Sequence, residues 1–155
     1  MKRIGLAWGA GAGVLWSLVP GFLSELLHPP GQAATVVLSG ALTGLLLSAG
    51  MAPLLVRARR WQVVVLGLVS LPLGAGSFAW FLTWSHLAVL KVTGVHFRGV
   101  MEIVEPPGYI FDPIGSFWWM AEMSLHPMPG LICLPLAILT AIGLRRQLTR
   151  FAPLH

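Results

Sequence analysis

Residues 61–85 read WQVVVLGLVSLPLGAGSFAWFLTWS, a run of 25 residues without a single charged side chain. An α-helix needs about 20 consecutive apolar residues to cross the ~30 Å hydrocarbon core of a membrane. Three more uncharged runs, at 4–24, 33–56 and 127–144, have the same character. Together they predict an all-α integral membrane protein with four transmembrane helices, at about residues 4–27, 33–56, 61–86 and 127–145.

The composition supports this class and excludes several others. Hydrophobic residues make up 56% of the 155 residues and charged residues only 10%, whereas a typical soluble domain is about 25% charged. A soluble enzyme, a nucleic-acid-binding domain and a disordered tail are therefore excluded. We expect one membrane domain, residues 1–155, whose main segment outside the bilayer is 87–126. The sole cysteine, Cys133, lies in the fourth run and has no intrachain disulfide partner.

Basic residues are distributed unevenly along the chain. Eight of the ten Lys and Arg fall before the first run, between the second and third, or after the fourth, and all five acidic residues fall elsewhere. The positive-inside rule places that basic side in the cytoplasm. We therefore expect cytoplasmic N- and C-termini in a multi-pass protein of the bacterial inner (plasma) membrane. The eight are Lys2, Arg3, Arg57, Arg59, Arg60, Arg145, Arg146 and Arg150.

Small residues recur every four positions in the first two runs. Four-residue spacing puts them on one helix face, and small residues let helix backbones approach closely in lipid. We expect the two runs to form a tight antiparallel hairpin through the short HPPG turn at 28–31, although one such face could instead dock a partner. The small residues are Gly5, Gly9, Gly13, Ser17 and Gly21 in the first run, and Gly40, Gly44 and Ser48 in the second.

The segment between the third and fourth runs predicts two local structures. Valines and isoleucines around Arg98-Gly99 favour a small β-hairpin within 91–108. Asp112 and Pro113 are typical of a helix start, and Pro127 prevents smooth continuation, so 112–125 predicts a helix of about three turns. It is too short to span, so we expect it at the outer interface. We expect Trp84, Trp118 and Trp119 to act as interface anchors.

Histidines offer one candidate ligand site. His28, His86 and His126 all map to the outer side of the predicted topology, and Glu122 precedes His126 by four residues, a spacing that places two ligands on one helix face. Such a group could bind Cu or Zn, ligate haem, or hydrogen-bond a quinone. The simpler interpretation is that polar residues merely collect outside the hydrocarbon.

No motif for catalysis is recognisable, because the chain has a single Asp and no phosphate-binding glycine loop. We therefore expect no resident cofactor and a non-catalytic accessory or scaffolding subunit, embedded in the lipid bilayer and packed against other membrane subunits or a second copy. One alternative is a small redox or metal-, haem- or quinone-binding membrane protein that uses the outer histidines. A second alternative is a small transporter.

The predicted topology can be tested by cysteine accessibility. A cysteine introduced at Gly108 should be labelled from outside the cell, and one at Arg59 only from the cytoplasmic side, because the two positions flank opposite ends of a span. The reverse pattern, or a fifth crossing, would overturn the four-span assignment.

Overall fold

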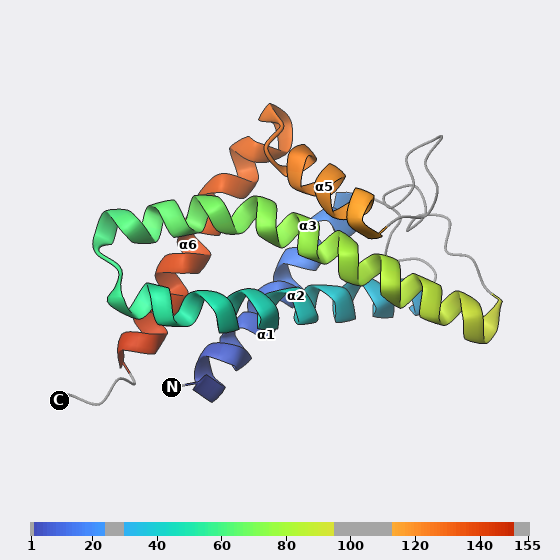
Figure 1. The fold of residues 1–155 in the computed structure, drawn as a ribbon, viewed down its shortest axis with the longest axis horizontal. Helices are drawn as coiled ribbons and strands as arrows, with labels where there is room; N and C mark the ends of the chain where they lie inside the picture. The colour runs from blue at the N-terminus through green and yellow to red at the C-terminus, as the bar shows by residue number, and fades with distance from the viewer. Residues whose placement is uncertain (1, 24–29, 95–112, 151–155) are drawn as a thin grey trace.

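The computed structural model describes residues 2–23, 30–94 and 113–150, and nearly all of them are helical (Figure 1). No strand occurs within these three ranges. The all-helical class predicted from the apolar runs is confirmed for this part of the chain. The helices are α1 (Lys2–Leu23), α2 (Pro30–Arg57), α3 (Arg60–Thr93), α5 (Pro113–Ser124) and α6 (Pro127–Arg150).

Three helical segments are long and apolar enough to cross a membrane, namely Gln32–Arg57 in α2, Arg60–Thr93 in α3 and Gly130–Arg150 in α6. The corresponding part of α1, Gly5–Leu18, is apolar but shorter. Length and hydropathy therefore support three of the four predicted spans directly. Prolines do not interrupt these three helices, because α2 continues through Pro53, α3 through Pro72 and α6 through Pro135.

The third helix is longer than the sequence indicates. It ends at Thr93, where Gly94 adopts a left-handed backbone (φ 69°) and its N–H donates to the Leu90 carbonyl (2.8 Å). Glycine is favoured in that conformation because it has no Cβ to clash. Residues 91–93, predicted as the start of a β-hairpin, are thus helical, and that prediction is wrong there because helix propagation overrides β-propensity. Residues 95–108 of the predicted hairpin lie outside the described ranges.

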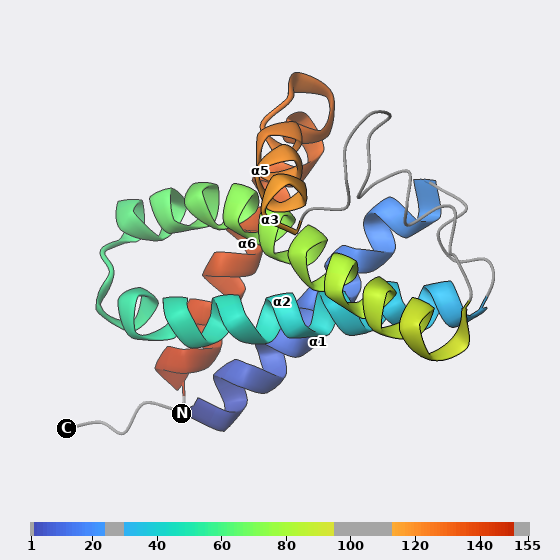
Figure 2. The ribbon, with the colours of Figure 1, turned by 45° about the vertical axis from the view of Figure 1, so that its right-hand side comes forward.

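The helices are arranged around α3, which contacts α2, α5 and α6, while α1 packs mainly on α2. The start of α1, the α2–α3 turn and the end of α6 lie towards the same end of the molecule (Figures 1 and 2). In the α2–α3 turn, the Arg59 N–H donates to Gln62 Oε1 (2.6 Å), which fixes the start of α3. The basic clusters of the sequence are therefore gathered at one end, which we call the basic end.

The buried side chains are apolar at the basic end of the bundle and include polar ones farther along α2 and α3. At the basic end a hydrophobic cluster joins α2, α3 and α6; its buried members are Leu55, Ala58, Val63, Ala141, Leu144 and Leu148. Farther along, polar side chains are buried on α2 and α3. Thr35 donates to the Gln32 carbonyl and Ser39 to the Thr35 carbonyl (both 2.7 Å), while Ser39 Oγ also lies 3.4 Å from Ser85 Oγ on α3. Bonding to carbonyls of their own helix satisfies these hydroxyls without water.

The helix predicted at 112–125 is present as α5, and a turn at residues 125–126 joins it to α6. We call this turn and the helix ends beside it, residues 122–127, the α5–α6 apex. A Cβ added at Gly76 of α3 would lie 2.8 Å from the Phe117 carbonyl oxygen, and one at Gly67 would lie 2.8 Å from Ile138 Cα. Thus α5 and α6 both touch the middle of α3, and the apex stands away from the bundle beside that middle (Figures 1 and 2).

The α3–α6 contact generates a stability prediction. Gly67→Ala places a methyl group against backbone of α6 that cannot yield, so the two helices must separate. We expect a loss of roughly 1–3 kcal/mol, the usual cost of overpacking, measured as a lower thermal unfolding midpoint in detergent. Gly50→Ala is the matched control, because open space surrounds that position. It should leave the midpoint unchanged or raise it, and equal losses in both variants would contradict the close contact.

Candidate functional site

The contact between α1 and α2 is made backbone to backbone at glycines. A Cβ added at Gly40 would lie 2.5 Å from the Gly13 carbonyl oxygen, and one at Gly44 would meet the Gly9 carbonyl. Because no real Cβ fits at such separations, only glycine allows this approach. Higher numbers on α1 face lower numbers on α2, so the two helices run antiparallel.

Two serines extend the same contact. A Cβ at Gly40 would also lie 2.5 Å from Ser17 Cβ, and one at Gly9 would meet Ser48. Both serines are buried, and their hydroxyls donate to carbonyls of their own helices. Gly5 belongs to a different contact, because its added Cβ would lie 3.1 Å from Leu148 Cδ2 on α6.

The small residues on α1 and α2 are therefore used inside the chain. While the two helices stay packed, the face formed by Gly9, Gly13, Gly40 and Gly44 is covered and cannot also receive a partner. Gly21 is part of α1, but its surroundings lie outside the described residues.

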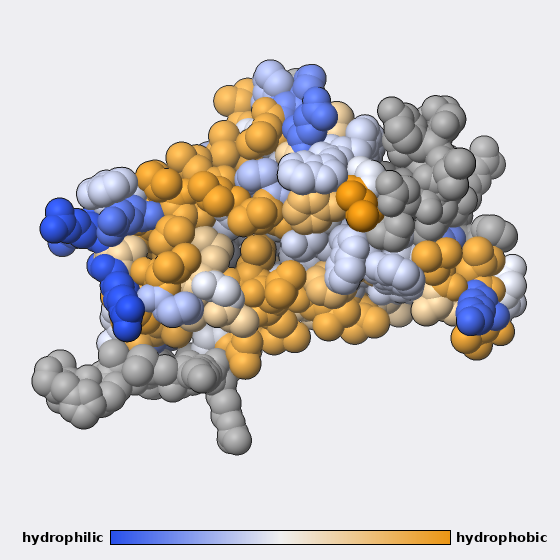
Figure 3. Space-filling view, viewed as in Figure 1, coloured by the Kyte–Doolittle hydropathy of each residue, from blue (hydrophilic) through white to orange (hydrophobic). Residues whose placement is uncertain are grey.

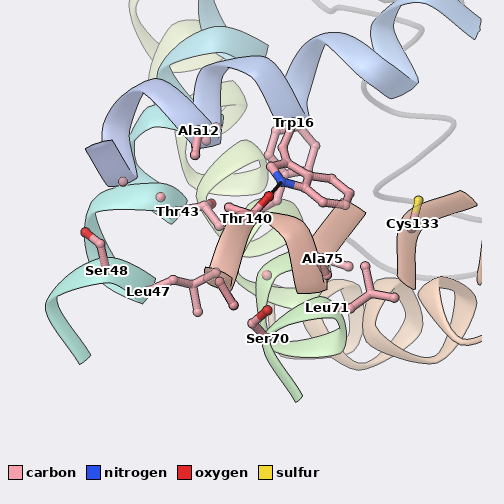
Figure 4. Close-up of a pocket in the computed structure, with 18 of the residues that line it drawn as sticks. Ala12, Trp16, Thr43, Leu47, Ser48, Ser70, Leu71, Ala75, Cys133 and Thr140 are labelled. Atoms are coloured by element: carbon pink, nitrogen blue, oxygen red, sulfur yellow. Dashed lines mark hydrogen bonds between the residues drawn. The ribbon is translucent and has the colours of Figure 1, made fainter. Parts of the chain in front are cut away.

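Beside this contact lies a cavity of about 380 Å³, which we call the central cavity (Figure 4). Residues of all five helices line it, and nearly all of the lining is apolar. Gly74 of α3 lies close to α2 at this cavity, because a Cβ added there would lie 3.2 Å from Leu47 Cδ1. The volume of the cavity falls within the roughly 300–1,000 Å³ typical of ligand pockets.

One wall of the central cavity is the contact between α1 and α6. Trp16 Nε1 donates to Thr140 Oγ1 (3.1 Å) across it (Figure 4). Both residues, with Trp8 and Ala12, also line a second and more open hollow of about 650 Å³, which we call the α1–α6 groove. The groove reaches the surface, because Leu15 in its lining is 66% exposed. These four residues thus lie between the central cavity and the α1–α6 groove.

The histidines predicted as ligands lie in different surroundings. His86 is fully buried in α3, whereas Glu122 and His126 are exposed at the α5–α6 apex, and His28 is outside the described residues. The helix that would put Glu122 and His126 on one face ends at Ser124, two residues before His126. Across the described ranges, no group of three or more His, Cys, Asp or Glu side chains could hold a metal ion.

The three predicted anchor tryptophans differ in exposure. Trp118 on α5 is 67% exposed and Trp84 on α3 is 51% exposed, while Trp119 is half-buried. Trp84 stacks edge-to-face with Trp80 (centroids 6.4 Å apart), and Trp118 does so with Phe117 (5.5 Å). Trp84 and Trp118 therefore present indole surface outward, as an anchor requires.

Two features of the site were not foreseen from the sequence. The central cavity has no linear signature, because its lining is drawn from five helices. The polar residues buried on α2 do have one: Thr35, Ser39 and Thr43 follow the same four-residue spacing as the small residues, and each hydroxyl bonds back to its own helix. That spacing could have been recognised as a second buried face of the helix.

Fold and site together define a helical protein whose long helices are apolar enough to cross a membrane and which has a partly open apolar cavity among them. No protein-family model matches the chain, and no curated protein or solved structure gives a significant match.

The glycine contact generates the next prediction. Gly13→Leu must force α1 and α2 apart, because the new side chain would be built into the backbone of Gly40 and Gly44. We expect a loss of about 3 kcal/mol or more, seen as a markedly lower melting midpoint and reduced yield in detergent. Gly11→Leu, two residues away, is the matched control, because nothing lies within 4 Å of its added Cβ. If both variants melt alike, the glycines do not form this contact.

Proposed function

We propose that the chain is a non-catalytic, multi-pass membrane subunit that binds another membrane protein through the α5–α6 apex. In this proposal α1 is the first of four spans, both termini are cytoplasmic, and the membrane is the bacterial inner membrane. Supporting this topology, the arginine-bearing ends of α2, α3 and α6 lie together at the basic end. The shared placement agrees with the positive-inside rule.

The depth of the α5–α6 apex is the observation that carries the proposal. The apex lies beside the part of α3 between Gly67 and Gly76. At 1.5 Å per residue, these glycines are about 10 and 24 Å from Arg60 at the basic end of the helix. If α3 crosses a hydrocarbon core of ~30 Å, the apex lies at the level of the lipid tails, deeper than the outer interface at which the sequence predicts this helix. In this proposal α5 and α6 together make the fourth crossing.

Polar groups at that depth need a protein partner. Glu122 and His126 are both exposed at the apex, and an unpaired charge in hydrocarbon costs several kcal/mol. A partner helix that supplies hydrogen-bond donors or a basic side chain would remove that cost. We therefore expect the partner to carry Lys, Arg, Asn or Gln within a membrane span.

Apolar side chains around the apex suit such an interface. Trp118, Leu125 and Leu131, which are near the two polar residues in the sequence, are 67%, 58% and 77% exposed. An exposed apolar side chain alone would simply face lipid. Combined with a polar centre, however, a large aromatic such as Trp118 is the kind of residue that contributes most of the energy of an interface.

Photo-crosslinking in native membranes tests the proposal. A benzophenone amino acid at Leu125 should yield one adduct of constant mass with a distinct membrane protein. Glu122→Ala should lower its yield at least about tenfold, because truncating one member of a buried polar pair weakens binding by several kcal/mol. Leu46, which is 52% exposed on α2, is the matched control position and should give no protein adduct.

Two outcomes would contradict the proposal. No protein adduct at Leu125 would mean that the apex meets lipid only. An adduct with twice the mass of the chain would identify a homodimer and not an accessory subunit.

A further inference from the structure

We propose that the central cavity binds one acyl chain of a membrane phospholipid, which enters from the α1–α6 groove. This inference concerns the interior of the bundle and not the exposed side chains of the α5–α6 apex, although Met123 and Ser124 at the apex also line the cavity. It does not depend on the docking partner.

The shape of the central cavity suits one extended chain. Its lining runs from Gly40 to Leu55 on α2 and from Ile132 to Leu144 on α6, which corresponds to roughly 18–22 Å of helix. The lining thus extends along several turns of both helices, which is the reach that an extended hydrocarbon chain needs.

The residues that line the central cavity favour a hydrocarbon ligand. None of the described residues that line the cavity is charged or a histidine. Its hydroxyls are already bonded to carbonyls of their own helices: Ser70 donates to Gly67 and Ser124 to Ala121, both at 2.7 Å. The wall therefore offers no counter-ion for a lipid head group, which must stay outside while the apolar chain fills the interior.

Flexible side chains allow the wall to fit a chain closely. Met51, Met120 and Met123 contribute from two helices, and methionine adapts to irregular apolar shapes. A void left unfilled in a helix bundle forfeits dispersion contacts on every side. A bound acyl chain would restore those contacts, whereas water could not.

The way in is the wall that the cavity shares with the α1–α6 groove. Trp8, Ala12, Trp16 and Thr140 line both spaces, and the Trp16–Thr140 hydrogen bond crosses between them (Figure 4). The groove is bordered by exposed apolar residues such as Leu15 and Leu136, which a lipid chain can approach from the bilayer. A turn of the Trp16 side chain would join the two spaces.

The surface over α2 and α3 is apolar beside the central cavity. Figure 3 shows a broad apolar belt over α2 and α3, with a hollow between these helices near its centre, and hydrophilic residues at the basic end. The central cavity thus lies at the level of this belt, where lipid chains and not head groups would surround the protein.

The experiment uses a phospholipid with a diazirine at the end of one acyl chain, added to the purified full chain in mild detergent. After irradiation, peptide mapping should find adducts on cavity-lining residues of α5 and α6, such as Met120 and Cys133. Ala75→Phe fills the cavity and should reduce these adducts to background. Ala88→Phe, the same change at an exposed position of α3, should leave them at the wild-type level.

Two further measurements test the proposal even if Ala75→Phe fails to fold. Ser70→Leu narrows the cavity at another point of α3 and should also remove the adducts, in protein that still elutes as one species and melts cooperatively. In the wild type, excess unlabelled phospholipid should suppress the adducts by competition.

Three results would overturn the proposal. One is persistence of the cavity adducts in either filled variant, and another is labelling of exposed residues alone. The third is competition by a polyprenyl alcohol but not by phospholipid, which would mean that the cavity takes a branched isoprenoid chain. Each result leaves the cross-link expected at Leu125 unaffected, so the two proposals fail separately.

Discussion

The contact between glycine backbones on α1 and α2 is the constraint on which the bundle depends. Gly13 and Gly40, with Gly9 and Gly44, bring the two helices closer than any larger side chain would permit. In lipid no hydrophobic force drives helices together, so close packing has to supply the attraction between them. Helices α1 and α2 thus form a close pair, and α3 and α6 pack against it.

The central cavity follows from the same contact. Small residues of α1 and α2 line the cavity on one side, and Gly74 and Ala75 of α3 line it on another. The cluster around Leu55 and Leu144 borders the cavity towards the basic end. Small residues that allow close helix contact thereby leave space beside that contact, which we propose is filled by a lipid acyl chain.

The α5–α6 apex shows how a short helix can alter the environment of a polar group. Because α5 packs along α3 and ends at Ser124, the chain turns beside the middle of α3 and not beyond its end. Glu122 and His126 are carried to that level together with Trp118. In the proposed topology this mixed apolar and polar surface lies at the depth of the lipid tails, where another protein would cover it.

The sequence alone determined which segments are helical, because uncharged apolar runs in lipid have no other way to satisfy their backbone hydrogen bonds. Pro113 and Pro127 predicted the two ends of α5. The four-residue spacing predicted the helix faces formed by small residues. The end of α3 was predicted wrongly, because propagation of the helix to Gly94 outweighed the β-propensity of Val92. Only the tertiary structure decided which glycines meet, that a cavity remains among five helices, and that His86 is buried apart from the exposed His126. These depend on distances between segments remote in sequence, which no local pattern encodes.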